Sequence, residues 1–150
     1  MLEPGIRPAT LDDVPEMVAL LAELFAIEAD FHADPARQTA GLRSLLESTT
    51  AKAWVAESQG RAVGMITLQI LISTAEGGEV GLVEDLVISV PWRRHGLGHR
   101  LIRTVEAWAW ERGLSRLQLL ADRENAPALD FYRKHEWTDT RLVALRKARE

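Results

Sequence analysis

The residues best suited to chemistry lie in one short segment, Glu84–Gly98, which reads EDLVISVPWRRHGLG. It opens with two adjacent carboxylates, Glu84 and Asp85, inside an apolar run where an ionised group is costly unless it has a partner or a task. It closes with a basic loop that contains two glycines. Carboxylates accept protons, and arginines beside glycines hold phosphate, so the segment combines a candidate base with a candidate anion site.

The basic loop is expected to lie between a strand that ends at Val90 and a helix that starts within the loop. Free N–H groups and the macrodipole at a helix N-terminus favour phosphate, and glycines let the backbone approach closely. The same residues would also suit an ordinary strand-to-helix turn with solvated arginines. The Walker, dinucleotide and serine-hydrolase motifs are absent.

The apolar pattern predicts the elements that position these residues. Strands are expected over 5–9, 53–57, 62–73, 80–90 and 116–121, with one or two more over 137–147. Helices are expected to begin between Thr10 and Pro15, to begin at Asp34-Pro35, and to span 96–112 and 125–135. The three central strands should form an antiparallel meander, and Val80 to Ala121 a right-handed parallel crossover. This is an α/β fold, with a mixed sheet of about six to seven strands flanked by about four helices.

Composition bounds the function. A chain of 150 residues predicts one domain over 1–150. The absence of cysteine excludes disulfides, thiolate zinc sites and cysteine nucleophiles, and makes the cytoplasm the default location. A net charge of −4 and the lack of a long apolar run give no sign of nucleic-acid or membrane partners. His95 and His99 are spaced as a helical pair but lack the rest of a metal motif, so no metal is expected.

Arg93–Gly98 matches the R/Q-x-x-G-x-G/A signature of the GCN5-related N-acetyltransferases, in the expected place between a strand and a helix. The later segment NAPALDFYRK, Asn125–Lys134, resembles the N-x-x-A-x-x-F-Y-x-K segment of the same family. The chain therefore resembles the GNAT superfamily from residue 5 to about residue 145. The resemblance implies the GNAT fold and an enzyme that transfers an acetyl group from acetyl-CoA to an amine.

The resemblance also implies how acetyl-CoA is bound. The strands on either side of the crossover helix would splay at a bulge, and the pantetheine arm would pair with the main chain of Leu86, Val87 and Ile88. The pyrophosphate would lie over the basic loop. Its implied binding residues are Arg93, Arg94, His95, Gly96, Leu97, Gly98 and His99. Asn125 would border the cofactor arm, although it also suits a plain helix cap.

Tyr132 resembles the family's general acid, which protonates the departing thiolate; an aromatic core residue is the alternative. Glu84 is the candidate base, and a main-chain N–H near Leu86 or Val87 would hold the oxyanion. Alternation places Glu84 and Asp85 on opposite faces unless a bulge intervenes. An ion pair with a neighbouring arginine is the alternative for the two carboxylates.

The Glu84-Asp85 pair also resembles the polyamine and thialysine acetyltransferase branch. The acceptor mouth would then be lined by Glu23, Glu28, Asp30 and Phe31, and it would favour a small cationic amine; a solvated helix face is the alternative. A protein or peptide acceptor, or a non-catalytic acyl-CoA-binding module, are the competing functions. A homodimer is expected because dimers are common in the family. Glu136 replaces a usual glycine, at a cost of about 1–2 kcal/mol if the left-handed conformation is kept.

Overall fold

A computed structural model describes residues 3–28 and 31–149. The chain divides into two compact units, one up to Leu119 and the other from Leu120 onward. The first unit holds the sheet and the three longer helices, and the second unit holds one shorter helix. Among the described residues, no helix is both long and apolar enough to cross a membrane.

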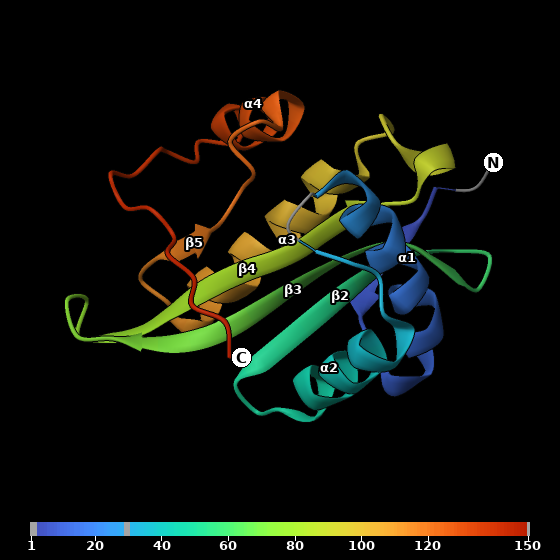
Figure 1. Ribbon diagram of the computed structural model, residues 1–150, viewed down its shortest axis with the longest axis horizontal. Helices are drawn as coiled ribbons and strands as arrows, with labels where there is room; N and C mark the ends of the chain where they lie inside the picture. The colour runs from blue at the N-terminus through green and yellow to red at the C-terminus, as the bar shows by residue number, and fades with distance from the viewer. Residues whose placement is uncertain (1–2, 29–30, 150) are drawn as a thin grey trace. The chain divides into compact units, whose positions relative to one another are not determined.

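The first unit is built on a five-stranded sheet with strand order β1-β2-β3-β4-β5 (Figure 1). Its strands are β1 Gly5–Pro8, β2 Ala51–Ser58, β3 Arg61–Ser73, β4 Gly78–Ile88 and β5 Leu117–Leu119. Neighbouring strands from β1 to β4 pair antiparallel. β5 pairs parallel to β4, and the crossover helix connects these two strands. The expected meander and parallel crossover are both confirmed.

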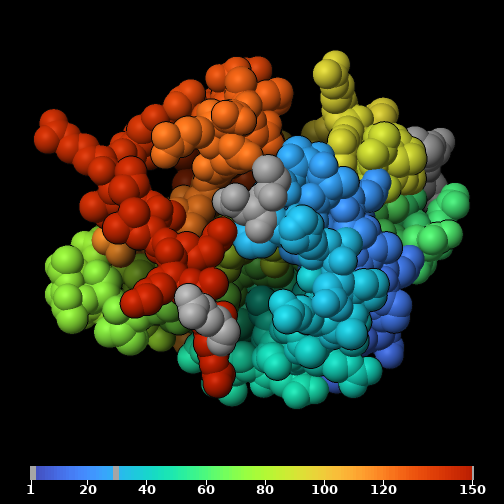
Figure 2. Space-filling view, in the orientation of Figure 1, coloured from blue at the N-terminus to red at the C-terminus, as the bar shows by residue number. Residues whose placement is uncertain are grey.

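Two helices cover one face of the sheet. They are α1 Val14–Ile27, entered through a 3-10 turn at Leu11–Asp13, and α2 Pro35–Glu47. Asp34 caps α2 as expected, because its Oδ1 accepts the N–H of Arg37 at 3.2 Å. The shared core contains Met17, Leu42 and Met65. Figure 2 shows the two helices, in blue to cyan, hiding much of this face.

The helix α3 Leu97–Arg112 covers the opposite face and lies behind the sheet in Figure 1. Its apolar stripe of Leu97, Leu101, Ile102, Val105 and Ala109 is buried as the helical spacing predicts. Gly113 ends α3 in the left-handed conformation, with φ 93°. The sheet is thus covered on one face by α1 and α2 and on the other by α3. The segment Glu84–Gly98 begins in β4 of this sheet and ends in α3.

The second unit contains α4, Ala126–Lys134. The one or two final strands expected over 137–147 are wrong, because no strand follows α4 in the described chain. Leu142, Val143 and Leu145 are exposed instead. The run does not alternate between apolar and polar residues, and an isolated strand gains no ladder hydrogen bonds. The sheet therefore has five strands rather than six or seven.

Candidate functional site

A β-bulge interrupts β4 at the acidic pair. Thr67 of β3 pairs with Glu84, but Met65 pairs with Val87, so Asp85 and Leu86 together face a single residue of β3. Asp85 takes up the extra length in the left-handed conformation, with φ 56°. Aspartate is among the non-glycine residues that tolerate this region best. The expected bulge is therefore present, and it re-aims the second carboxylate.

Two polar side chains of β3 hold the acidic pair. The hydroxyl of Thr67 donates to the carbonyl oxygen of Glu84 at 3.1 Å and to Oδ2 of Asp85 at 3.4 Å. Gln69 Nε2 donates to Oε1 of Glu84 at 3.4 Å. Glu84 is exposed, whereas Asp85 is half-buried. None of the ion pairs found in 3–28 and 31–149 includes either carboxylate, so the alternative of an arginine partner is not realised.

Burial raises the pKa of the Asp85 carboxyl to about 6, from an ordinary value near 3.8. The neighbouring negative charge of Glu84 and, more weakly, that of Glu28 raise this pKa further. The Thr67 hydrogen bond acts in the opposite direction, because it stabilises the ionised carboxylate. The surroundings of Asp85 thus displace the pKa of its carboxyl toward neutral pH.

The ladder between β4 and β5 stops just before the bulge. Pairing runs from Gly81–Leu117 to Val83–Leu119, and Leu86, Val87 and Ile88 lie beyond its end. Gly81 permits the close approach of β5, since a Cβ there would lie 2.6 Å from Leu117 Cδ2. Within the first unit, this stretch of β4 therefore has an edge without a strand partner, as the predicted splay requires.

The basic loop leads from β4 into α3. A 3-10 turn at Val90–Trp92 follows the strand, and Arg94 and Gly96 both have left-handed φ values, 64° and 81°. No side chain caps the start of α3. A helix start without a side-chain cap is a setting in which main-chain N–H groups can bind an anion. Figure 2 shows this segment, in yellow, projecting from the first unit.

The loop residues do not all face outward. Arg93 donates from Nε to the carbonyl oxygen of Ile88 at 2.8 Å, which ties the loop to the end of β4. Leu97 is buried, so only its main chain can meet a ligand. The side chains of Arg94, His95 and His99 are exposed, and Gly98 is half-buried. No group of three metal-ligating side chains comes together among the residues described.

The residues predicted to line the acceptor mouth have different surroundings in the structure. Glu28 caps the C-terminal end of α1 and acts electrostatically on Asp85. Glu23 is engaged elsewhere, because its Oε1 accepts the N–H of Val90 at 3.3 Å. The Phe31 ring packs 5.4 Å from that of Phe25 and is 44% exposed. Asp30 lies outside the described residues.

The remaining predicted residues belong to the second unit. Asn125 caps α4, since its Oδ1 accepts the N–H of Ala128 at 3.2 Å. The ring of Tyr132 packs edge to face with Phe131 at 5.4 Å and lies 6.0 Å from that of Trp137. Tyr132 is thus half-buried in an aromatic cluster.

Glu136 keeps the left-handed conformation that its position demands, with φ 69°. The Trp137 N–H donates to the carbonyl oxygen of Tyr132 at 3.0 Å, and the Glu136 N–H donates to that of Arg133 at 3.1 Å. These two bonds form a Schellman motif at the end of α4. The helix end is therefore not rebuilt around the glutamate.

Sequence reasoning missed Thr67 and Gln69 as parts of the site. Both are polar residues on β3, where Thr67 lies directly opposite Glu84 and Gln69 lies opposite Leu82. A hydroxyl and an amide at alternate positions of the apolar run VGMITLQI were the available signal.

The sequence profile of the acetyltransferase (GNAT) family matches residues 16–137. The chain is 27% identical over 127 residues to the aminoalkylphosphonate N-acetyltransferase of Salmonella typhimurium, covering 85% of this chain and 80% of that protein. It also resembles a possible acetyltransferase from Clostridium difficile 630, with a TM-score of 0.87, 17% identity and coverage of 99% of both chains. An aminoglycoside acetyltransferase from an uncultured soil sample gives a TM-score of 0.82 at 22% identity, covering 98% of this chain and 97% of that one. At these identities the two structures show a shared fold.

Proposed function

Because the chain belongs to the acetyltransferase (GNAT) family, we propose that this enzyme transfers the acetyl group of acetyl-CoA to a primary amine of a small, cationic molecule. The observation that carries the proposal is the bulge in β4. It sets a half-buried carboxylate, Asp85, beside a strand edge that has no strand partner within the first unit. A proton acceptor and an extended binding edge are what amine acylation by a thioester needs.

The residues of the first unit suit acetyl-CoA. The main chain of Leu86–Ile88 would pair with the amide groups of the pantetheine arm, in the manner of an added strand. The uncapped start of α3 would receive the pyrophosphate, with Arg94, His95 and His99 supplying charge and hydrogen bonds. Arg93 would act indirectly, by holding the loop against Ile88.

Asp85 is the preferred base over Glu84. A lysine-like amine has a reference pKa of about 10.4, so it must lose a proton before or during attack on the thioester carbon. Asp85 takes that proton, because its pKa of about 6 leaves it ionised but basic at neutral pH. The N–C bond forms, a main-chain N–H near Leu86 or Val87 holds the oxyanion, and the C–S bond then breaks.

Tyr132 is proposed as the acid that protonates the departing thiolate. A phenol with a reference pKa of about 10 can supply a proton to a thiolate whose conjugate acid has a pKa of about 8.5 only while the two are in close contact. Its position in the motif NAPALDFYRK supports this role, and Asn125 would border the same cofactor arm.

A cationic acceptor is supported by the carboxylates around the bulge. Glu28, Glu84 and Asp85 give this region negative charge, and Phe31 offers an exposed ring beside the end of α1. The Salmonella relative acts, by its name, on an aminoalkylphosphonate, so a zwitterionic amine belongs in the same test. We also propose a homodimer in the cytoplasm; exposed Trp110 on α3, at 53%, is a surface a partner copy could cover.

The test is calorimetric titration with acetyl-CoA, followed by thiol release against polyamines, diamines, lysine analogues, aminoglycosides and aminoalkylphosphonates. Turnover of a cationic amine, reduced about a hundredfold or more in Tyr132→Phe, is the expected result. Binding without turnover of any small amine would favour a peptide acceptor or a non-catalytic module. Failure to bind acetyl-CoA would overturn the proposal.

A further inference from the structure

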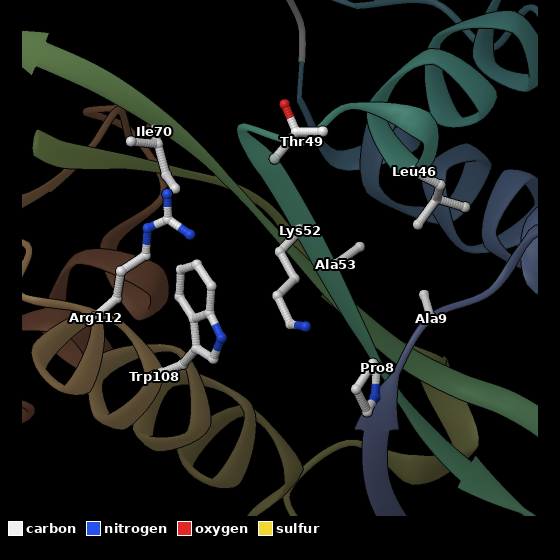
Figure 3. Close-up of a pocket in the computed structure, with 10 residues that line it drawn as sticks. Pro8, Ala9, Leu46, Thr49, Lys52, Ala53, Ile70, Trp108 and Arg112 are labelled. Carbon is white, nitrogen blue, oxygen red and sulfur yellow. The ribbon is translucent and has the colours of Figure 1, made fainter.

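A cavity of about 300 Å³ lies where β1 ends beside β2 (Figure 3). The pairing of β1 with β2 finishes at Pro8 and Trp54, followed by one hydrogen bond from the Ala9 N–H to the carbonyl oxygen of Ala53. The first residues of β2 continue past this end, and they form one wall of the cavity. Its volume is at the lower end of the range for small-molecule sites.

Lys52 brings an ammonium group into this cavity. Its Nζ lies 5.6 Å from the ring centroids of both Trp54 and Trp108. Neither an ion pair nor a side-chain hydrogen bond is found for Lys52 in the described part of the chain, and the residue is half-buried. Indole faces stabilise a cation without neutralising it, so three N–H donors remain for an anion.

Arg112 adds a second cation over the same indole. Its Cζ lies 5.6 Å from the Trp108 ring centroid, and its guanidinium donates to Glu79 at 3.2 and 3.4 Å. Figure 3 shows the side chains of Lys52 and Arg112 both reaching the Trp108 ring. The cavity lining thus holds two cations: Arg112 is paired with Glu79, and Lys52 has no ion pair in the described part of the chain.

The lining also includes apolar side chains. Pro8, Leu46 and Ile70 contribute hydrocarbon surface to the cavity. We propose that this cavity is a second ligand site, which binds a small organic acid. The carboxylate would lie between Lys52 and Arg112, and the apolar body of the acid would pack against these three residues and the indole of Trp108.

The cationic end of this site is on the opposite face of the sheet from the acidic pair. Lys52 alternates with Ala53, which packs in the core under α1 and α2, and Lys52 therefore faces α3. Thr67, whose hydroxyl contacts Asp85, is two residues from Met65 on β3, so both side chains point to the face covered by α1 and α2. The organic acid would therefore not compete directly with the acceptor amine.

The test uses benzoate as the acid and follows the indole N–H signals of the five tryptophans by NMR. Benzoate is expected to move the signals of Trp54 and Trp108 and to leave that of exposed Trp110 in place. Benzyl alcohol, which has the same ring without the charge, is expected to bind at least about tenfold more weakly. Inorganic phosphate, which has charge without an apolar body, is expected to do the same.

Lys52→Gln is expected to weaken benzoate binding about tenfold or more, while Lys52→Arg keeps most of it. Arg43→Gln is the matched control, because it removes an exposed cation of α2 that does not line the cavity. Arg112→Gln serves as a second variant should Lys52→Gln fail to fold. The proposal would be overturned if wild type, Lys52→Gln and Arg112→Gln bound benzoate with equal affinity. It would also be overturned if phosphate bound as tightly as benzoate.

Discussion

The hydroxyl of Thr67 donates to Oδ2 of Asp85 across 3.4 Å, from the strand that pairs with the bulged one. The same hydroxyl lies 3.1 Å from the main-chain carbonyl oxygen before the bulged residue. One side chain therefore fixes both the backbone of the bulge and the orientation of the carboxylate, so the two cannot vary independently.

Replacing Asp85 should remove most of the activity. We expect Asp85→Asn to lower kcat/KM about a hundredfold or more, because the proton acceptor is lost. Asparagine is the appropriate substitute, since it tolerates the left-handed conformation at φ 56° that alanine would strain. Initial rates of thiol release measure the effect. Glu84→Gln is the matched control and should cost less than about tenfold; the reverse order would assign the base to Glu84.

The pH dependence should report the same carboxylate. Because the base must be ionised, kcat/KM is expected to rise with pH through about 6, the pKa of Asp85. Thr67→Val removes a hydrogen bond that lowers this pKa, so the rising limb should move to higher pH. Glu28→Gln removes a negative charge that raises it, so the limb should move to lower pH. Shifts in the same direction in both variants would contradict the assignment.

Asp85 should also destabilise the fold at neutral pH. Its pKa is raised in the folded protein, so stability is greatest when the carboxyl is protonated and falls as pH rises from about 4 to about 6. Asp85→Asn should therefore raise Tm at pH 8 and change it little at pH 4. Thermal unfolding followed by circular dichroism at the two pH values gives the comparison. A lower Tm at pH 8 would mean that the ionised carboxylate stabilises the fold.

The ion pair between Arg7 and Asp13 should support the entry into α1. Arg7 Nη1 and Nη2 each donate at 2.8 Å to buried Asp13, and the Thr10 N–H donates at 2.8 Å to the same carboxylate. The Arg7 hydrogen bond holds the pKa of Asp13 below its ordinary value. This stabilisation is therefore present above about pH 4 and is lost as pH falls through the lowered pKa.

Arg7→Gln is expected to cost about 3 kcal/mol in the free energy of unfolding, because it leaves a buried carboxylate without its cation. Urea denaturation at pH 7 measures the loss. Arg37→Gln is the control, since its pair with Asp34 is exposed and 3.6 Å long, and it should cost no more than about 0.5 kcal/mol. Comparable losses in the two variants would show that burial of Asp13 does not matter.

Glu136→Gly should stabilise the protein. The glutamate holds the left-handed position of a Schellman motif, at φ 69°, where glycine avoids a cost of about 1 kcal/mol. A rise in the free energy of unfolding of about that size is expected in denaturant titrations. Lys134→Gly, at the last helical residue of α4, should instead destabilise the helix.

Local signals predicted most of the fold. The helix boundaries depend on local interactions. The side chains of Asp34 and Asn125 cap the starts of α2 and α4, and Gly113 ends α3 because it adopts the left-handed conformation. The meander and the crossover followed from short turns and handedness. The prediction of final strands was wrong because a strand needs pairing partners elsewhere in the chain, and residues 137–147 lack the alternation typical of a strand.

The site was predicted less completely for the same reason. The existence of the bulge was expected, but its register decides which carboxylate is held, and that depends on Thr67 in another strand. Glu84 remains the base predicted from the sequence, and the raised pKa of Asp85 comes from burial that the sequence pattern does not reveal. Arg93 remains a predicted phosphate ligand, and its bond to Ile88 arises from the way the loop folds back. The contacts that were not predicted join segments that the sequence pattern does not pair.

The unpaired edge of β4 has a consequence for handling the protein. A strand that exposes its main-chain donors and acceptors is a template on which a second chain can add and begin aggregation. In the first unit the ladder with β5 covers only Gly81–Val83, so Leu86–Ile88 present such a template. We expect coenzyme A to act as a solubilising agent: preparations that contain it should precipitate more slowly on concentration than those without it.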